Sequence, residues 1–327
     1  MSQKVAIVNA NSFGRYFPEY IEMLKDKVGD VERFTVDKNI SATELSEQLQ
    51  GYEYLIVGTT PQFSEDFFKL TPSIKYIARF GIGYNNVDVL GAKKYDVIAS
   101  NIPGVLEKED VAEHAVGLLM SLIKHSVDGD KAVRSMEWNV NRGRFLGMRL
   151  HGKTVGVLGM GNIGKTFAHI MANGFGCKIL GYDPYLSKEE MEKRGAEKKE
   201  LDEILAESDV LSLHINLTNE SYHLMNKECL QKVKTGAYIV NTARGELVDE
   251  VAMCEALKEG KLAGYGADVI EAEPPKEDNP LLTCPHTVLT PHLATYNAEC
   301  NRQMCKSIVD DVVAVSKGQK PSVVLEK

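Results

Sequence analysis

The chain has 327 residues, of which 43% are hydrophobic and 26% charged, so it is neither disordered nor fibrous and is long enough for about two domains. Its formal charge of −8 argues against a nucleic-acid or polyanion partner, which would need a basic face. No apolar run reaches the ~18 residues of a membrane span, and the first residues lack the apolar core of a signal peptide. Six cysteines without C-x-x-C pairs or metal-ligand spacing are typical of reduced thiols, so we expect a cytoplasmic protein with no metal site.

Short apolar runs alternate with helical patterns through the first hundred residues. Ser41 and Glu44 form the capping-box pattern that opens a helix. This alternation predicts a parallel sheet with helices on both faces. The predicted strands cover residues 5–8, 31–36, 54–57 and 75–79.

The pattern changes at Asn101-Ile102-Pro103-Gly104, where proline and glycine end a strand. A helix is predicted over about 110–127, followed by an irregular polar segment over 138–150. This segment contains Arg142 and Arg144. We interpret these arginines as solvated, with contact to a substrate phosphate as the alternative.

A second alternation of strands and helices begins at Gly152, which predicts a second doubly wound sheet. A helical pattern over about 297–315 closes the chain. The predicted strands cover residues 154–158, 178–182, 210–213, 237–240, 262–268 and 287–289.

A G-x-G-x-x-G motif, Gly159-Met160-Gly161-Asn162-Ile163-Gly164, directly follows a predicted strand and opens a helix. Gly159 would make the tight turn, Gly161 would let a pyrophosphate approach the backbone, and Gly164 would let helix and strand pack closely. The N–H groups at the helix start, at Asn162 and Ile163, would bind the phosphates. The motif therefore predicts a dinucleotide site.

Asp183 lies 19 residues after Gly164, at the end of the next predicted strand. A carboxylate there can accept hydrogen bonds from the adenosine ribose of NAD and would repel the 2′-phosphate of NADP. No arginine follows Asp183 at once to bind that phosphate. The alternative is a glycine turn with a solvated aspartate, but the context favours NAD.

Three later segments carry residues suited to acid–base chemistry, and each follows a predicted strand. Arg244 is suited to a carboxylate or a polarised carbonyl, and the alternative for it is a surface ion pair. Residues 268–273 hold three carboxylates. His292 can exchange a proton near neutral pH, and a nearby glutamate would hold its tautomer.

The chain resembles the D-isomer-specific 2-hydroxyacid dehydrogenases, which include D-lactate, D-phosphoglycerate and hydroxypyruvate or glyoxylate enzymes. The resemblance covers nearly the whole chain, and its motifs come in the family's order. They are residues 79–88, 111–114, 159–164, the segment of Arg244, the Glu273-Pro274 pair and Pro291-His292.

The resemblance implies an α/β fold of two doubly wound parallel-sheet domains. A Rossmann dinucleotide-binding domain, residues 102–296, would be inserted into a flavodoxin-like substrate domain formed by residues 1–101 and 297–327. It further implies a homodimer that pairs through the helix from about Asp110 and the segment 138–150.

The resemblance also implies the roles of the site residues. His292 would be the proton donor, Glu273 its partner, and Arg244 the residue that binds a 2-keto acid. Backbone N–H groups of Ile82 and Gly83 would bind the substrate carboxylate.

By the same resemblance, four residues would contact NAD. Asp268 and the backbone of Thr242 and Ala243 would hold the nicotinamide carboxamide, and His214 would touch the cofactor.

We therefore predict that the chain is an NAD-dependent oxidoreductase acting on a small 2-keto or 2-hydroxy acid. D-3-phosphoglycerate dehydrogenase is the alternative within the family, although that substrate would need a basic phosphate site and we expect no regulatory domain after Lys327. An NAD-binding corepressor and a formate or phosphite enzyme are alternatives from other classes.

Overall fold

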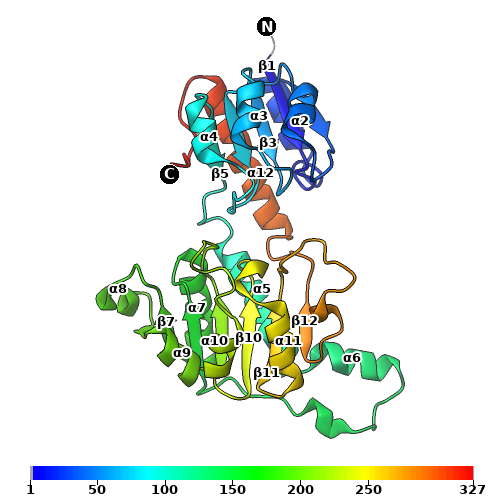
Figure 1. Cartoon of the computed structure of the whole chain (residues 1–327), viewed down its shortest axis with the longest axis vertical. Coiled ribbons are helices and arrows are strands. Elements are labelled where there is room, and N and C mark those ends of the chain that lie inside the picture. Colours follow the sequence, from blue (N-terminus) through cyan, green and yellow to red (C-terminus); the bar gives the residue numbers. More distant parts are fainter. Residues whose placement is uncertain (1–2, 327) are drawn as a thin grey trace. The chain divides into compact units, whose positions relative to one another are not determined.

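The computed structural model describes residues 3–326, and the chain divides into two compact units. Unit 1 comprises Met1–Glu107 and Tyr296–Lys327, and unit 2 comprises Lys108–Thr295. Each unit is α/β, and Figure 1 shows their elements coloured along the chain. Within residues 3–326, no helix is both long enough and apolar enough to cross a membrane.

Unit 1 contains a five-stranded sheet in the order β2-β1-β3-β4-β5. All neighbouring strands run parallel, which confirms the predicted flavodoxin-like topology. The elements are β1 (Gln3–Val8), α1 (Glu19–Lys27), β2 (Gly29–Phe34), α2 (Ala42–Gln48), β3 (Tyr54–Val57), α3 (Glu65–Leu70), β4 (Tyr76–Arg79), α4 (Val89–Lys94), β5 (Ile98–Asn101) and α12 (Ala298–Ser316).

Helices cover both faces of this sheet because its strands are apolar on both faces. Val5 and Ile7 pack with α1 and α12, whereas Val8 packs with α2, α3 and α4. The predicted capping box begins α2, with the N–H of Glu44 donating to the hydroxyl of Ser41.

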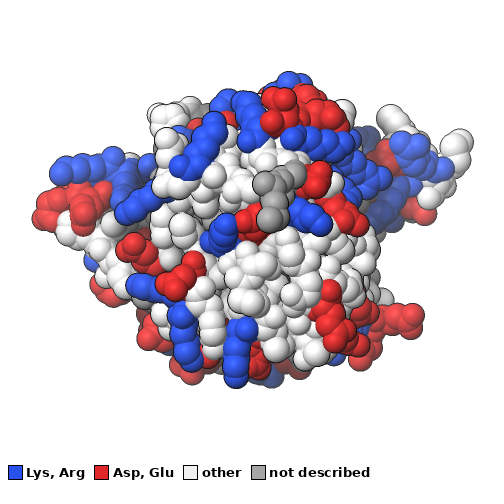
Figure 2. Space-filling model, turned by 90° about the horizontal axis from the view of Figure 1, so that it is seen from above, with Lys and Arg blue, Asp and Glu red and all other residues white. Residues whose placement is uncertain are grey.

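Figure 2 shows acidic and basic side chains interspersed over one face of the molecule, so that face carries no continuous basic surface.

Residues 102–107 belong to unit 1, whereas the boundary predicted after Asn101 placed them in the dinucleotide domain. Ile102 is fully buried in the core of unit 1. Where the chain returns, Tyr296 packs edge to face on Tyr16 with the ring centroids 6.2 Å apart. Burial of apolar side chains therefore sets these boundaries, and the Pro-Gly pattern does not.

Unit 2 contains a seven-stranded sheet in the order β12-β11-β10-β9-β6-β7-β8. This is the strand order of the predicted Rossmann fold, and β12 is added beside β11. The elements are α5 (Lys108–Ile123), α6 (Ser126–Arg134), β6 (Thr154–Leu158), α7 (Asn162–Phe175), β7 (Lys178–Tyr182), α8 (Lys188–Lys193), β8 (Glu197–Lys198), α9 (Leu201–Glu207), β9 (Val210–Leu213), α10 (Lys227–Lys232), β10 (Ala237–Asn241), α11 (Glu250–Lys258), β11 (Leu262–Ala267) and β12 (Thr287–Leu289), with 3₁₀ helices η1 (Arg142–Phe145), η2 (Gly245–Leu247) and η3 (Pro280–Leu282).

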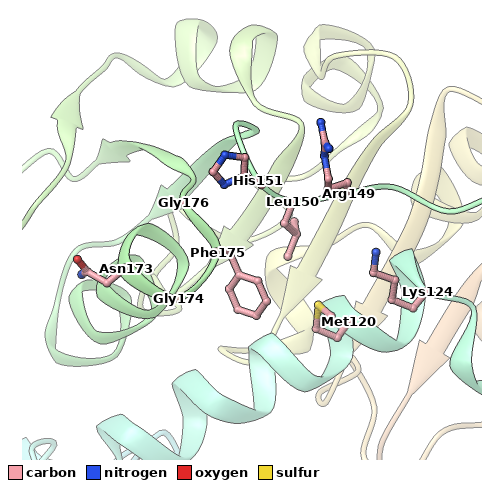
Figure 3. A pocket seen from close by; sticks show the side chains of 9 residues that line it. All are labelled: Met120, Lys124, Arg149, Leu150, His151, Asn173, Gly174, Phe175 and Gly176. Atoms are coloured by element: carbon pink, nitrogen blue, oxygen red, sulfur yellow. The ribbon is translucent and has the colours of Figure 1, made fainter.

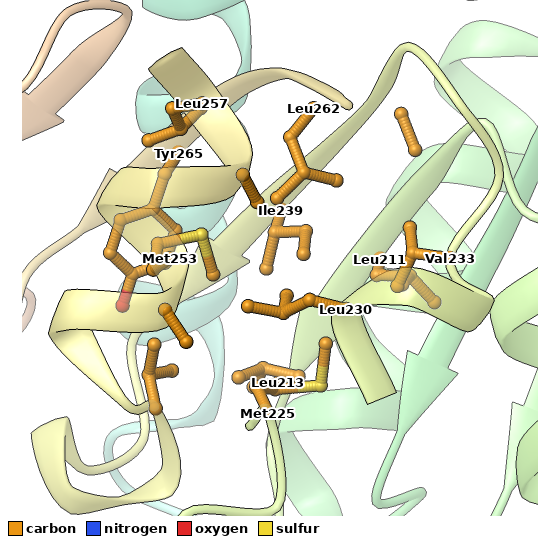
Figure 4. Packing of buried hydrophobic residues seen from close by; sticks show 14 of the residues in the cluster. Leu211, Leu213, Met225, Leu230, Val233, Ile239, Met253, Leu257, Leu262 and Tyr265 are labelled. Carbon is orange, nitrogen blue, oxygen red and sulfur yellow. The ribbon is translucent and has the colours of Figure 1, made fainter. Parts of the chain in front are cut away.

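Two apolar clusters cover the faces of this sheet. In the cluster of Figure 4, Leu213, Ile239 and Tyr265 of the strands meet Leu230 of α10 and Met253 of α11. The other cluster packs α5 and α7 on strands of the same sheet. Because the faces are buried, the loops at the strand ends are the places where this unit can present polar groups to a ligand.

The helix predicted over 110–127 is wrong in its last turn, because the chain forms two helices there. His125 separates α5 from α6 with a left-handed φ of 51°. The apolar face of α5 is buried against α7, β10 and β11, whereas α6 is mostly exposed. Figure 1 shows α6 and the following segment extending away from the sheet of unit 2, and we call residues 126–148 the arm.

Candidate active site

The predicted site residues of unit 2 follow six neighbouring strands of its sheet. Parallel strands end at the same edge, so these segments form one row. The sheet reverses its order between β9 and β6, which is where ligands of such sheets bind. From β12 to β7 the row contains His292, Asp268, Arg244, His214, Gly159 and Asp183.

The glycine loop after β6 has space for a phosphate. Gly159 has a φ of 90°, and a Cβ there would lie 2.5 Å from the carbonyl oxygen of His214. A Cβ at Gly164 would lie 1.9 Å from the carbonyl oxygen of Gly159. In contrast, a Cβ at Gly161 would meet no atom within 4 Å, and Asn162 begins α7 directly after it. Two glycines are thus required by the fold, and the third leaves open a cradle that fits a dinucleotide.

Asp183 follows β7 and contacts this loop. Its carboxylate accepts the N–H of Met160 at 3.1 Å and that of Tyr185 at 3.0 Å. Arg194, at the end of α8, donates to the carbonyl oxygen of Met160. This arginine was not predicted, because it lies 34 residues from Met160 in the chain and no short motif indicates the contact.

His214 lies across the switch point from the glycine loop. Its N–H donates to the carbonyl of Leu158 at 2.7 Å, and its Nε2 lies 2.8 Å from the hydroxyl of Ser212. The ring packs against Phe167, and its desolvation lowers the pKa of His214 to about 3. His214 is therefore neutral near pH 7 and does not act as the acid of a reaction there.

The segment after β10 is organised by the buried side chain of Asn241. Its oxygen accepts the N–H of Ala243 at 3.0 Å, and its amide donates to the carbonyl of Arg244 at 2.8 Å. The hydroxyl of Thr242 is buried and has no hydrogen-bond partner among the described residues. Because an unpaired buried hydroxyl is costly, this hydroxyl is suited to form a hydrogen bond with a bound ligand.

Asp268, only 1% exposed, holds the turn after β12. Its carboxylate accepts the N–H groups of Leu293 at 2.7 Å and Ala294 at 2.8 Å and the hydroxyl of Thr290 at 2.5 Å. The Nε2 of His114 lies 3.2 Å away. Burial alone would raise the pKa of Asp268, but these hydrogen bonds outweigh it and hold the pKa below its usual value. Its contact with nicotinamide stays a prediction. His114, the last residue of the motif at 111–114, was given no role in the sequence analysis.

His292 and Glu273 meet, with Nδ1 and Oε2 2.8 Å apart. A carboxylate can only accept, so Nδ1 donates and Nε2 is the nitrogen left for a substrate. His292 has a left-handed φ of 55°, and its N–H donates to the carbonyl of Asp268 at 2.8 Å. The side chains are 43% and 41% exposed, so water weakens their charge interaction.

Ile82 and Gly83 belong to unit 1 and lie in the turn after β4. The side-chain amide of Asn101 donates to the carbonyl of Ile82 at 2.5 Å and so holds this turn. The N–H groups of Ile82 and Gly83 find no acceptor among residues 3–326. Their role toward a substrate carboxylate stays a prediction.

Figure 3 shows a pocket of about 520 Å³ in unit 2. It is formed by α5 and the C-terminal end of α7, with Lys124, Arg149 and Phe175 among its lining residues. The glycine loop lies at the other end of α7, about 20 Å away for a helix of 14 residues. This pocket is therefore not the dinucleotide site.

The two arginines considered for a substrate phosphate, Arg142 and Arg144, both lie in the arm. Arg144 pairs with Glu137 at 2.5 Å and lies 4.8 Å from the centre of the Phe145 ring. Arg142 is exposed. Among the described residues, no three His, Cys, Asp or Glu side chains gather as a metal site would require.

The fold and its row of strand ends are typical of dinucleotide-binding domains. Residues 116–294 match the family model for the NAD binding domain of D-isomer specific 2-hydroxyacid dehydrogenases. The chain is 38% identical over 278 residues to a glyoxylate reductase of Korarchaeum cryptofilum, covering 84% of this chain and 83% of the relative.

Two further relatives widen the comparison. The chain is 35% identical over 283 residues to a D-3-phosphoglycerate dehydrogenase of Bacillus subtilis, covering 86% of this chain but 53% of the relative. The crystal structure of a D-lactate dehydrogenase from Aquifex aeolicus, complexed with NAD and lactic acid, has a TM-score of 0.83 at 29% identity over 96% of each chain. The chain belongs to the D-isomer-specific 2-hydroxyacid dehydrogenases and is an NAD-dependent oxidoreductase.

Glycine substitutions should separate cofactor binding from folding. We expect Gly161→Ala to keep its thermal stability and to bind NADH at least about tenfold more weakly, because the added methyl group would enter only the phosphate cradle. Gly164→Ala should lose both, because its Cβ would collide with the carbonyl of Gly159. Gly174→Ala, also with no atom within 4 Å, is the control and should weaken neither, because alanine is favoured over glycine within a helix. Thermal melts and NADH fluorescence titrations measure both properties, and unchanged affinity in Gly161→Ala would remove the loop from the site.

Asp183 should set the preference for NADH over NADPH. We expect the unmodified chain to favour NADH by roughly 100-fold in kcat/KM, because the carboxylate repels a 2′-phosphate. In Asp183→Ala the preference should fall below about tenfold, because Arg194 remains near to attract that phosphate. Asp202→Ala, an exposed aspartate of α9 paired with Lys232, is the control. Steady-state assays with both cofactors test this, and equal use of the two by the unmodified chain would contradict it.

Proposed function

We propose that the chain interconverts a small 2-keto acid and its D-2-hydroxy acid, with His292 as the acid and base. The contact of 2.8 Å between His292 Nδ1 and Glu273 Oε2 carries the proposal, because it fixes the ring with Nε2 free for a substrate oxygen. Arg244, two strands away in the same row, supplies the cation that a keto acid needs.

Each residue has a chemical task in this proposal. NADH, when bound at the glycine loop, supplies the hydride. The protonated His292 donates from Nε2 to the carbonyl oxygen of the keto acid, and in the reverse direction the neutral ring takes that proton back. The guanidinium of Arg244 binds the substrate and stabilises negative charge developing on oxygen.

The relatives support a small substrate. The glyoxylate reductase is 38% identical to this chain, and the phosphoglycerate dehydrogenase is 35% identical. Of the two arginines considered for a substrate phosphate, Arg144 is paired with Glu137 within the arm, whereas Arg142 is exposed. We therefore place glyoxylate, pyruvate and hydroxypyruvate ahead of 3-phosphohydroxypyruvate as substrates.

The pH dependence of turnover should reveal the His292–Glu273 pair. With NADH and the fastest of these keto acids, the rate of reduction should fall as pH rises. The rate of hydroxy-acid oxidation should rise over the same pH window. An ionised Glu273 favours the protonated ring, so Glu273→Gln should move both midpoints to lower pH. His292→Ala should lower kcat by roughly 10²–10⁴-fold. Arg244→Ala should both lower kcat and raise KM for the keto acid.

Glu277→Gln, an exposed glutamate of the same loop, is the matched control and should leave the profiles in place. His214 cannot supply the midpoint, because its pKa is lowered to about 3 by desolvation. Profiles that do not move in Glu273→Gln would refute the pairing.

We also propose that two copies pair through the arm. The arm exposes large apolar side chains, with Met136 at 90%, Trp138 at 67% and Leu146 at 87%. The long helix named in the sequence-based prediction does not contribute such surface, because α5 buries its apolar face within unit 2. A two-fold pairing would bury the same patch on both copies.

Light scattering should therefore give about twice the 36.2 kDa of one chain. Trp138→Asp with Leu146→Asp should give single chains, because charged side chains in an apolar interface are costly. Val251→Asp changes a residue of similar type that is 59% exposed on α11, and it should leave the mass unchanged. A mass near 36.2 kDa at every concentration for the unmodified chain would rule out the pairing.

A further inference from the structure

Glu250 is a buried carboxylate that joins the two ends of the loop carrying Glu273. It is the first residue of α11 and is 8% exposed. Its Oε1 accepts the N–H of Glu271 at 2.9 Å, and its Oε2 accepts the side-chain amide of Asn279 at 2.7 Å. The residues between Glu271 and Asn279 are mostly exposed, so the two hydrogen bonds to Glu250 hold the ends of the loop on α11.

The start of the loop also packs directly on the segment of Arg244. A Cβ at Gly245 would lie 1.9 Å from the carbonyl carbon of Ile270 and 2.3 Å from the nitrogen of Glu271. Glu250 follows Gly245 by five residues, so its hydrogen bond to Glu271 joins the same two segments a second time. The backbone positions of Arg244 and of the loop are therefore set together.

A third contact holds the side chain of Glu271. The hydroxyl of Tyr222 donates to Glu271 Oε1 at 2.9 Å, and the Nε2 of His223 lies 3.4 Å from Oε2. The rings of Tyr222 and His223 stack with centroids 4.0 Å apart, and the N–H of His223 donates to the carbonyl of Glu246. Glu271 is thus held by its backbone and its side chain, two residues before Glu273.

We propose that Glu250 is a positioning residue that keeps Glu273 in place beside His292. This inference rests on the proposed function of that pair. A carboxylate suits the task because it can accept from two donors at once, whereas a glutamine would turn its own NH₂ donor toward one of them. A buried carboxylate without these two partners would be costly, so the loop and Glu250 depend on each other.

The pH profile of Glu250→Gln tests the proposal on the full chain. We expect the midpoint for reduction of the fastest of glyoxylate, pyruvate and hydroxypyruvate to move to lower pH, as in Glu273→Gln but by about half as much. The kcat should fall about tenfold, because the pair is held less closely, with KM values within about twofold. Glu255→Gln, on the same helix but exposed and paired with Lys227, should move nothing.

The double variant separates positioning from a merely structural role. If Glu250 acts through Glu273, then adding Glu250→Gln to Glu273→Gln should shift the midpoint no further. A further shift, or no shift in the single variant, would overturn the proposal. Should Glu250→Gln fail to fold, Asn279→Ala removes one partner only and should give a smaller shift in the same direction.

An NMR titration of the His292 ring, without substrates and assigned with His292→Ala, gives the pH midpoint independently of turnover. If Glu273→Gln moves this midpoint and Glu250→Gln does not, the positioning role alone is wrong. If neither variant moves the midpoint, the His292–Glu273 pairing is wrong too, and both proposals fall.

Discussion

The candidate site of unit 2 depends on one buried carboxylate, that of Asp268. Removing a carboxylate from water is costly, and Asp268 is stable there because N–H and hydroxyl donors surround it. The same bonds keep the turn after β12 in a conformation that places His292 in the left-handed region, which costs of the order of 1 kcal/mol for a side chain other than glycine. Through His114, the carboxylate also reaches α5 and so joins the first helix of the unit to its last strand.

Sequence reasoning reached the parts of the site that are local in the chain. The glycine loop, Asp183, Arg244 and His292 each follow a strand directly, and a parallel sheet then brings such strand ends together. The strand alternation likewise predicted both sheets, because buried parallel strands are continuous apolar runs.

The supporting residues could not be found in this way. Glu250 reaches Glu271 over 21 residues and Asn279 over 29, and Arg194 reaches Met160 over 34. Each is an ordinary charged residue near the end of a helix, and no short motif distinguishes it from a solvated one. The break at His125 was missed for a similar reason, because periodicity does not reveal where the packing surface under α5 ends.

The position of α12 has a consequence for the order in which the protein is made. This helix supplies Cys300, Met304 and Ile308 to the core on one face of the unit 1 sheet. All five strands of that sheet precede it by almost two hundred residues, with the whole of unit 2 between them. On the ribosome, unit 2 can therefore complete its core first. One apolar face of the unit 1 sheet stays uncovered until α12 has been synthesised.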